Sequence, residues 1–346
     1  MTGTVRDLAL SLPAEVVEHR RVELPSAELV TSGDFAAWRR YRGPSDAGWW
    51  VGSSEVAAVL GEDPDRSALE VYAAKLGIDD ADTAEALDRD AAGIDGAQQF
   101  LRWGLLQEPA IALGYHMQTG ARIIDQGRYS LYRRRDDPSF ACTPDYFAEH
   151  RDIGLAVLEC KNVGEHRADR WREGPPTRVL IQVQHQLWTL DQKVGAVACL
   201  LGGNRLWHAK VERDEAFCDA MVAAVHEFLK RLRDRDPPAA VGHDRELRAV
   251  SRLWPRAKEG SVVQLPDSAA QHMTRWLRAK GLEKAAEKRR KAAEAHLRIA
   301  IGDAEVGKLS DGRSLSLRET ERAATRVVPA PELEPIRYRV LRQEKE

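Results

Sequence analysis

The spacing of apolar residues changes twice along the middle of this chain. From 98 to 120 they recur every three or four positions, as on an amphipathic helix. Helical spacing returns from 178 to 190, after the break at Pro175-Pro176. Three segments between them alternate with a period of two, which is typical of the short strands of a meander: 122–131, 139–147 and 154–162. A chain that mixes the two periods in this way requires a fold in which helices cover a sheet.

The same pattern continues on both sides of this stretch. Strands are predicted at 194–201 and 206–211, joined by a turn at Gly202-Gly203-Asn204, and a helix follows at 214–233. We therefore predict an α/β (α+β) domain at 31–235 with a mixed central sheet flanked by helices. An N-terminal extension occupies 1–30. Asp236-Pro237-Pro238 marks the start of a C-terminal extension, 236–346, with a basic helix and short strands.

Composition excludes several classes of protein. Of the 346 residues 43% are hydrophobic, enough to bury a core, so wholesale disorder is excluded. No apolar run approaches the roughly 18 residues of a membrane helix, and the polar start does not resemble a signal peptide. We expect a cytoplasmic protein without a membrane partner. The net charge of −2 neither requires nor forbids a nucleic-acid partner. The four cysteines contain no CxxC pair and are predicted to be buried: Cys142, Cys160, Cys199 and Cys218.

Two acids and a lysine carry the most specific chemistry. If 156–161 is a strand, Glu159 and Lys161 share one face while Cys160 points the other way. Asp145 ends the preceding strand and can lie beside them in a hairpin. Two carboxylates so placed, with the backbone carbonyl of Cys160, suit a hard cation such as Mg²⁺ or Mn²⁺. The arrangement suits phosphodiester hydrolysis, although an ion pair on a sheet surface would produce the same pattern.

Four sequence blocks, one of which contains Asp145, Glu159 and Lys161, follow one another in a fixed order along the chain. They are Gly52-Ser53-Ser54-Glu55-Val56 with Leu60-Gly61; Trp103-Gly104-Leu105-Leu106-Gln107-Glu108-Pro109 with Thr119-Gly120; Thr143-Pro144-Asp145 with Leu158-Glu159-Cys160-Lys161; and Gln182-Val183-Gln184-His185-Gln186-Leu187-Trp188. With these blocks the sequence resembles the YqaJ-type viral recombinase family, to which lambda-type phage exonucleases are similar, within the PD-(D/E)xK nuclease superfamily. The resemblance spans roughly residues 50–215.

The resemblance implies a role for each matching position. Asp145, Glu159 and Glu108 resemble the acids that hold the metal, which is Mg²⁺ or Mn²⁺, two ions per active site. Lys161 resembles the catalytic lysine, and Gln182 the glutamine that opens the helix after the sheet and faces the active centre. Without the family, Glu108 is equally a solvent-facing helix acid and Gln182 an amide on an amphipathic helix.

The positions expected to contact DNA match the family's pattern less completely than the expected metal ligands do. Ser54 matches the serine that binds the terminal phosphate in the family, but Ala47 stands where an arginine is expected, so we assign that role to Arg42 or its neighbours Arg39 and Arg40. His185 stands where the family often has an aromatic ring, and we expect it to stack or hydrogen-bond with DNA.

Three basic clusters are candidates for phosphate contacts: 39–42, 133–135 and the group Arg167, Arg170 and Arg172. We favour the third because it directly follows the catalytic strand. Trp49, Trp50 and Trp171 can stack on bases, although most tryptophans pack in cores.

The function implied by the resemblance is a Mg²⁺-dependent exonuclease that degrades linear double-stranded DNA from 5′ ends and leaves 3′ overhangs for recombination. Its expected partners are DNA ends, further copies of itself in a ring-shaped trimer, and a single-strand annealing protein. One alternative is a Cas4- or helicase-associated nuclease, although the iron–sulfur cysteine set common there is missing; an endonuclease is another. From a different class, a catalytically silent DNA-binding subunit would keep the fold without the chemistry.

Overall fold

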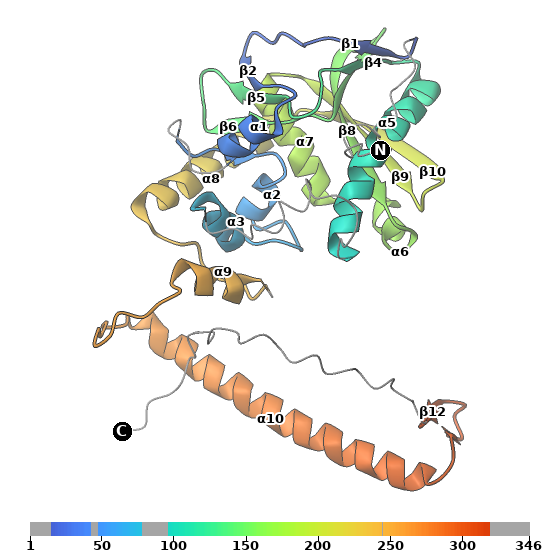
Figure 1. Ribbon diagram of the computed structural model, residues 1–346, viewed down its shortest axis with the longest axis vertical. Helices are drawn as coiled ribbons and strands as arrows, with labels where there is room; N and C mark the ends of the chain where they lie inside the picture. The colour runs from blue at the N-terminus through green and yellow to red at the C-terminus, as the bar shows by residue number, and fades with distance from the viewer. Residues whose placement is uncertain (1–14, 43–47, 78–95, 244, 319–346) are drawn as a thin grey trace, which may run out of the picture. The chain divides into compact units, whose positions relative to one another are not determined.

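The computed structural model describes residues 15–42, 48–77, 96–243 and 245–318 (Figure 1). The chain divides into two compact units, Met1–Pro255 and Arg256–Glu346. The first unit extends past residue 235 because α9 (Glu246–Leu253) packs against α3 (Ala68–Lys75). No helix in the described part of the chain is both long enough and apolar enough to cross a membrane.

A six-stranded mixed sheet forms the centre of the first unit. Its strand order is β1 (Val17–His19), β4 (Arg122–Asp125), β7 (Tyr146–His150), β8 (Gly154–Val163), β9 (Val194–Leu201) and β10 (Arg205–Glu212). The β1–β4 and β8–β9 pairs are parallel and the other pairs are antiparallel. The predicted mixed α/β architecture is therefore confirmed.

Two long helices cover opposite faces of this sheet. Figure 1 shows α5 (Gly96–Thr119) and α7 (Thr177–Leu190) on either side of β8. Residues of α5 such as Ile111 share a buried cluster with Leu158 and Cys160. Residues of α7 such as Val183 share another with Val157. The alternation along β8 therefore directs its odd-numbered side chains toward α7 and its even-numbered ones toward α5, as the period of two predicts.

A second, four-stranded sheet lies in the same unit. Its order is β2 (Ala27–Thr31), β5 (Leu131–Arg134), β6 (Phe140–Cys142) and β3 (Val51–Gly52). The expectation of one meander at 122–162 is therefore wrong. The segment 122–131 leaves the six-stranded sheet after Asp125 and joins the second sheet only at Leu131. The segment 139–147 turns at Thr143–Asp145, so its first half forms β6 and its end enters β7. Period-two spacing does not reveal such turns, because both halves keep their alternation.

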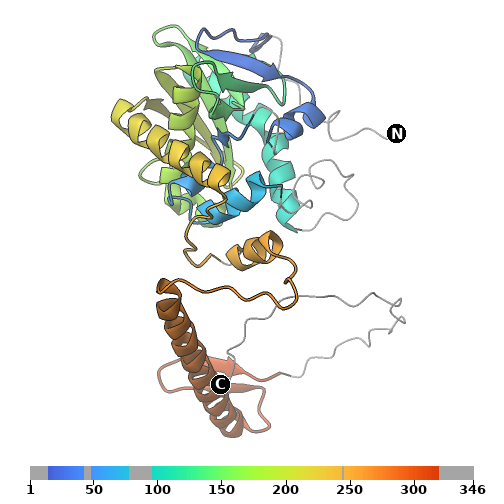
Figure 2. The ribbon, with the colours of Figure 1, turned by 90° about the vertical axis from the view of Figure 1, so that its left-hand side faces the viewer.

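Besides α5, α7 and α9, the described part of the first unit contains further helices. They are α1 (Phe35–Arg42), α2 (Val56–Val59), α3, α6 (Glu165–Ala168), the 3₁₀ helix η2 (Asp169–Trp171) and α8 (Glu215–Asp234). Helices α2, α3 and α8 share a buried cluster with Ile181 of α7 (Figure 2). Ser67 caps α3 in a capping box with Glu70.

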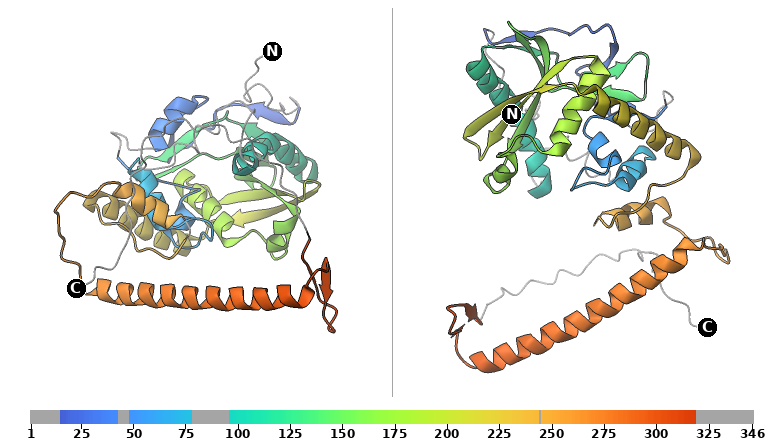
Figure 3. Two further views of the ribbon diagram at one scale, coloured as in Figure 1. Left: turned by 60° about the horizontal axis from the view of Figure 1, so that its bottom comes forward. Right: turned by 180° about the vertical axis from the view of Figure 1, so that it is seen from behind.

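The second unit consists of a long helix and a small hairpin. Helix α10 (Ser268–Ile301) is followed by β11 (Val306–Lys308) and β12 (Ser314–Ser316), which pair antiparallel (Figure 3). None of the residues of α10 is buried. The predicted basic helix and short strands are both present in this unit.

Candidate active site

The hairpin of β7 and β8 brings the two central acids together. Tyr146 pairs with Leu158, and one step further in the same register Asp145 stands opposite Glu159. The backbone N–H of Cys160 donates to Asp145 Oδ2 at 2.8 Å. A bond from the neighbouring strand therefore holds Asp145 beside Glu159, as expected, but Asp145 immediately precedes the strand that pairs with β8 rather than ending it.

Glu159 is the most tightly held carboxylate of this group. It is 2% exposed, and its Oε1 forms an ion pair with Lys161 Nζ and accepts a hydrogen bond from Gln182 Nε2 at 2.6 Å. Its Oε2 accepts from Gln186 Nε2 at 2.7 Å. Sequence reasoning missed Gln186. The available signal was its spacing, since a residue four positions after Gln182 lies on the same side of a helix.

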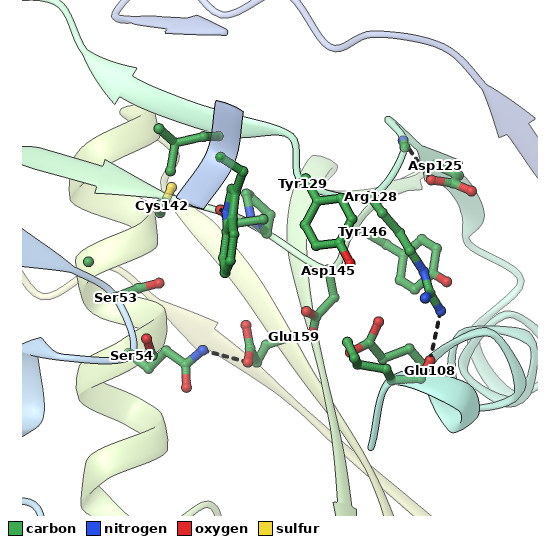
Figure 4. A pocket seen from close by; sticks show the side chains of 18 of the residues that line it. Ser53, Ser54, Glu108, Asp125, Arg128, Tyr129, Cys142, Asp145, Tyr146 and Glu159 are labelled. Atoms are coloured by element: carbon green, nitrogen blue, oxygen red, sulfur yellow. Dashed lines mark hydrogen bonds between the residues drawn. The ribbon is translucent and has the colours of Figure 1, made fainter. Parts of the chain in front are cut away.

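One cavity of about 500 Å³ collects the predicted catalytic residues. Its lining includes Glu108, Asp145, Glu159, Lys161 and Gln182. Glu108 comes from α5, and Figure 4 shows its side chain in the same pocket as those of Asp145 and Glu159. The structure therefore brings together in one place five side chains that the sequence analysis placed on four separate elements.

The cavity holds more negative charge than its own lysine offsets. Burial raises the pKa of Asp145 well above its usual value, and the charges of Glu159 and Glu108 add to that increase. Burial also raises the pKa of Glu108 to about 7, against the opposing charge of Arg128. For Lys161, burial alone would lower the pKa, but Glu159 and Asp145 raise it. Carboxylates that repel one another in a buried site favour a bound cation.

The side-chain oxygen atoms in this cavity are of the chemical type that binds a hard divalent cation. Carboxylate oxygens are the ligands that Mg²⁺ and Mn²⁺ prefer, and four carboxylates line this cavity: Asp125 and the three predicted ligands Glu108, Asp145 and Glu159. Within the described ranges no three His, Cys, Asp or Glu side chains are gathered closely enough to form a ready-made metal site. Oε1 of Glu159 is contacted by Lys161 and Gln182, whereas Oε2 accepts one hydrogen bond, from Gln186, and keeps a second lone pair with which a cation can be bound.

Cys160 faces the opposite side of the strand from Glu159. Its thiol is buried against the α5 side of the sheet, and burial raises the pKa of that thiol well above its usual value. Only its backbone carbonyl remains a candidate oxygen ligand. All four cysteines are free and buried, as expected.

Ser54 and His185 differ in what they offer to a ligand. Ser54 is exposed and lines the cavity, in a turn where Glu55 Oε2 accepts from the backbone N–H of Gly52 at 2.9 Å and lies 2.7 Å from Lys75 Nζ. His185 is 0% exposed, with Nε2 3.1 Å from the carbonyl oxygen of Val51. The expectation that His185 contacts DNA is therefore wrong: it is a core residue that connects α7 to β3.

Most of the other predicted DNA contacts lie away from the cavity. Arg167, Arg170 and Arg172 are exposed on α6, η2 and the residue after them, directly beyond β8. The side chain of Arg42 lies outside the described residues. Trp171 is buried against Trp207, so stacking on bases is excluded for it.

The run 133–135 has structural partners. Arg134 lies 4.2 Å from the ring centroid of Trp188, and Arg133 pairs with Glu28. Trp50 is buried, but it lines the cavity.

Comparison with known proteins identifies similar sequences. Residues 34–193 match the family model described as the YqaJ-like viral recombinase domain. The uncharacterized protein YqaJ of Bacillus subtilis (strain 168) is 21% identical over 262 residues, which are 74% of this chain and 76% of that protein.

Similar solved structures include two exonucleases. The alkaline exonuclease LHK-Exo from Laribacter hongkongensis is 17% identical, with a TM-score of 0.39 over 59% of this chain and 95% of that one. LHK-Exo has also been solved in complex with dAMP, at 19% identity and a TM-score of 0.39 over 54% of this chain and 89% of that one. A phage-related exonuclease from Haemophilus somnus 129PT is 14% identical, with a TM-score of 0.31 over 54% of this chain and 96% of that one.

Proposed function

Residues 34–193 carry a YqaJ-like viral recombinase domain, and from this premise we propose that the chain is a metal-dependent deoxyribonuclease with a PD-(D/E)xK core. One observation carries the proposal: Asp145, Glu159 and Lys161 meet across the β7–β8 hairpin in a cavity that also receives Glu108. A catalytically silent DNA-binding subunit has no need for this concentration of repelling carboxylates.

Each of these residues has its own role in the proposed reaction. Asp145, Glu159 and Glu108, with the carbonyl of Cys160, would hold Mg²⁺ or Mn²⁺, one or two ions per site. A cation bound there would polarise a phosphoryl oxygen and lower the pKa of an attacking water. Lys161, which pairs with Glu159 at the edge of this site, would stabilise the charge that develops on the phosphoryl group. Gln182 and Gln186 hold the Glu159 carboxylate in one orientation.

The substrate we propose is linear double-stranded DNA, degraded from 5′ ends to leave 3′ overhangs for recombination. This polarity follows from the resemblance in the sequence, as do the homotrimer and the single-strand annealing partner. A Cas4- or helicase-associated nuclease is disfavoured because all four cysteines are buried and dispersed in the core clusters rather than grouped around an iron–sulfur cluster.

The test of the proposal is digestion of duplex DNA labelled at its 5′ or 3′ ends, with Mg²⁺ and with EDTA. We expect loss of the 5′ label as mononucleotides, no cutting of closed circles, and no activity in EDTA. Asp145→Asn and Lys161→Ala should each abolish the reaction, and Lys210→Ala, an exposed lysine on β10, should retain it. Full activity in either active-site variant would overturn the mechanism, whereas cutting of circles would favour an endonuclease.

A further inference from the structure

The turn between β4 and β5, residues 126–130, has an unusual backbone. Tyr129 has a φ of 62°, in the left-handed region that non-glycine residues seldom adopt. The other two described non-glycine residues with positive φ, Asp191 and Arg235, are the C-caps of α7 and α8, where this conformation is common. Tyr129 ends no helix. Strained backbone of this kind persists where the surrounding structure enforces it, often at a binding site.

Hydrogen bonds from several segments enforce this turn. The backbone N–H of Gly33 donates to the Arg128 carbonyl at 2.8 Å, and Thr31 Oγ1 donates to the Tyr129 carbonyl at 2.8 Å. Gln126 Nε2 donates to the carbonyl of Pro144 at 2.9 Å, immediately before Asp145. The turn is therefore fixed to the same backbone segment that places the central carboxylate.

The turn presents two side chains to the cavity, Arg128 and Tyr129 (Figure 4). The ring of Tyr129 lies 5.1 Å from that of Phe35 and 5.4 Å from that of Trp38, measured between centroids, so one wall of the cavity is aromatic. Trp38 donates its Nε1 to Thr143 Oγ1 at 2.9 Å, which joins this wall to the segment before Asp145.

Arg128 is the cation of this cavity that no carboxylate neutralises by direct contact. Its Nη2 donates to the carbonyl of Leu105 at 3.1 Å. In the described part of the chain, no carboxylate lies within ion-pair distance of its guanidinium, whereas Lys161 is engaged by Glu159. A phosphate entering a cavity lined by carboxylates requires a cation with hydrogen-bond donors still available, and a guanidinium has five.

We propose that the turn 126–130 is the subsite for the nucleotide at the cleaved DNA end. Arg128 binds a phosphate of that nucleotide, and Tyr129 stacks against its base. Stacking on an aromatic face accepts any base, so this subsite adds affinity without sequence preference. The inference rests on the proposed nuclease function and assigns that function's substrate contacts to two residues outside the metal site.

The test measures DNA binding separately from cleavage. A fluorescent duplex with a 5′ phosphate is titrated in Ca²⁺, used in place of Mg²⁺ to limit cleavage, and kcat and KM are then measured in Mg²⁺. Arg128→Met, which keeps the length of the side chain, should weaken binding roughly tenfold and lower the salt slope by about one. Arg122→Met, at an exposed arginine on β4 that contacts Glu18, is the matched control and should change neither quantity.

Tyr129 is tested by two replacements. Tyr129→Asn removes the ring but tolerates the left-handed backbone, so the fold should persist while KM rises roughly tenfold with little change in kcat. Tyr129→Phe keeps the ring and should keep the affinity.

The outcomes separate the two proposals. If the wild type cleaves DNA and both Arg128→Met and Tyr129→Asn bind and cleave normally, the subsite is wrong and the nuclease stands. If the wild type binds ends through these two residues but does not cleave, the nuclease is wrong and the subsite stands. If the wild type neither binds nor cleaves DNA, both the nuclease function and the subsite are rejected.

Discussion

Gln186 donates Nε2 to Glu159 Oε2 at 2.7 Å, although its side chain is fully buried in α7. A hydrogen bond to a charged acceptor is worth about 1.5–3 kcal/mol, and loss of this bond leaves Glu159 held through Oε1 alone, by Lys161 and Gln182, so that Oε2 is no longer oriented. We expect Gln186→Leu to lower kcat roughly thirtyfold, equivalent to about 2 kcal/mol, with KM for DNA little changed.

The matched control for Gln186 is Gln184 on the same helix. Gln184 donates to the carbonyl of Glu212 and accepts from the backbone N–H of Asp214, and it does not contact Glu159. Gln184→Leu should therefore lower the melting temperature without lowering kcat. A kcat that falls equally in both variants would contradict a positioning role for Gln186.

Asp145 should destabilise the protein when no cation is present. Folding buries the Asp145 carboxylate beside Glu159 and Glu108, and this raises its pKa. The charged form of Asp145 therefore disfavours the folded state at neutral pH. Asp145→Asn removes that charge while its side-chain oxygen can still accept from Cys160. We expect the melting temperature of the first unit to rise by about 2–4 °C in EDTA, and the stabilisation by added Mg²⁺ to shrink. Asp219→Asn, at an exposed position on α8, is the control. A melting temperature below that of the wild type would reject the repulsion argument.

Sequence pattern predicted the two long helices beside the sheet and the side-chain alternation of β8 well because these depend on local spacing. Residues 98–120 and 178–190 differ from α5 and α7 by at most a residue or two at each end. Glu159 and Lys161 also lie on one face of the strand and Cys160 on the other, as predicted. These features need only the period of one element and the direction of its neighbours.

The features that the sequence did not reveal depend on distant contacts. The separation of β5 and β6 into a second sheet follows from turns whose bonds reach residues 31–33 and 144. The burial of His185 follows from the packing of α2 and β3 against α7, which no local pattern records. Arg128 and Tyr129 belong to such a turn, so no motif in the sequence marked them.

His185 makes the protein less stable as the pH falls. Burial lowers the pKa of its imidazole from 6.5 to about 4. The unfolded chain therefore takes up a proton below pH 6.5 that the folded chain refuses until about pH 4, so the free energy of unfolding falls across this window. The full difference is about 3 kcal/mol.

The pH dependence is checked by urea denaturation between pH 4 and pH 7. We expect His185→Gln, which can still donate to the Val51 carbonyl, to have a shallower dependence than the wild type. His166→Gln, at an exposed histidine on α6, should leave the slope unchanged. A His185→Gln slope equal to that of the wild type would show that the ring is protonated as readily in the folded state as in the unfolded one.

The exposed arginines after β8 should contribute nonspecific DNA affinity. Arg167, Arg170 and Arg172 are exposed on α6, η2 and the adjoining residue, and Arg172 forms an ion pair with exposed Asp169 at 2.8 Å. Each phosphate contact releases counterions, so replacing all three with glutamine should lower the slope of log affinity against log salt by up to about three.

Their position outside the catalytic cavity predicts a particular kinetic signature. KM should rise at moderate salt while kcat at saturating DNA stays within about twofold, because uniform binding is lost and the chemistry is untouched. The control is a triple replacement in α10, Lys284, Lys288 and Lys291, which tests whether any three basic residues give the same effect. An unchanged salt slope in the α6–η2 variant would exclude this surface as a DNA contact and transfer the role to other basic segments.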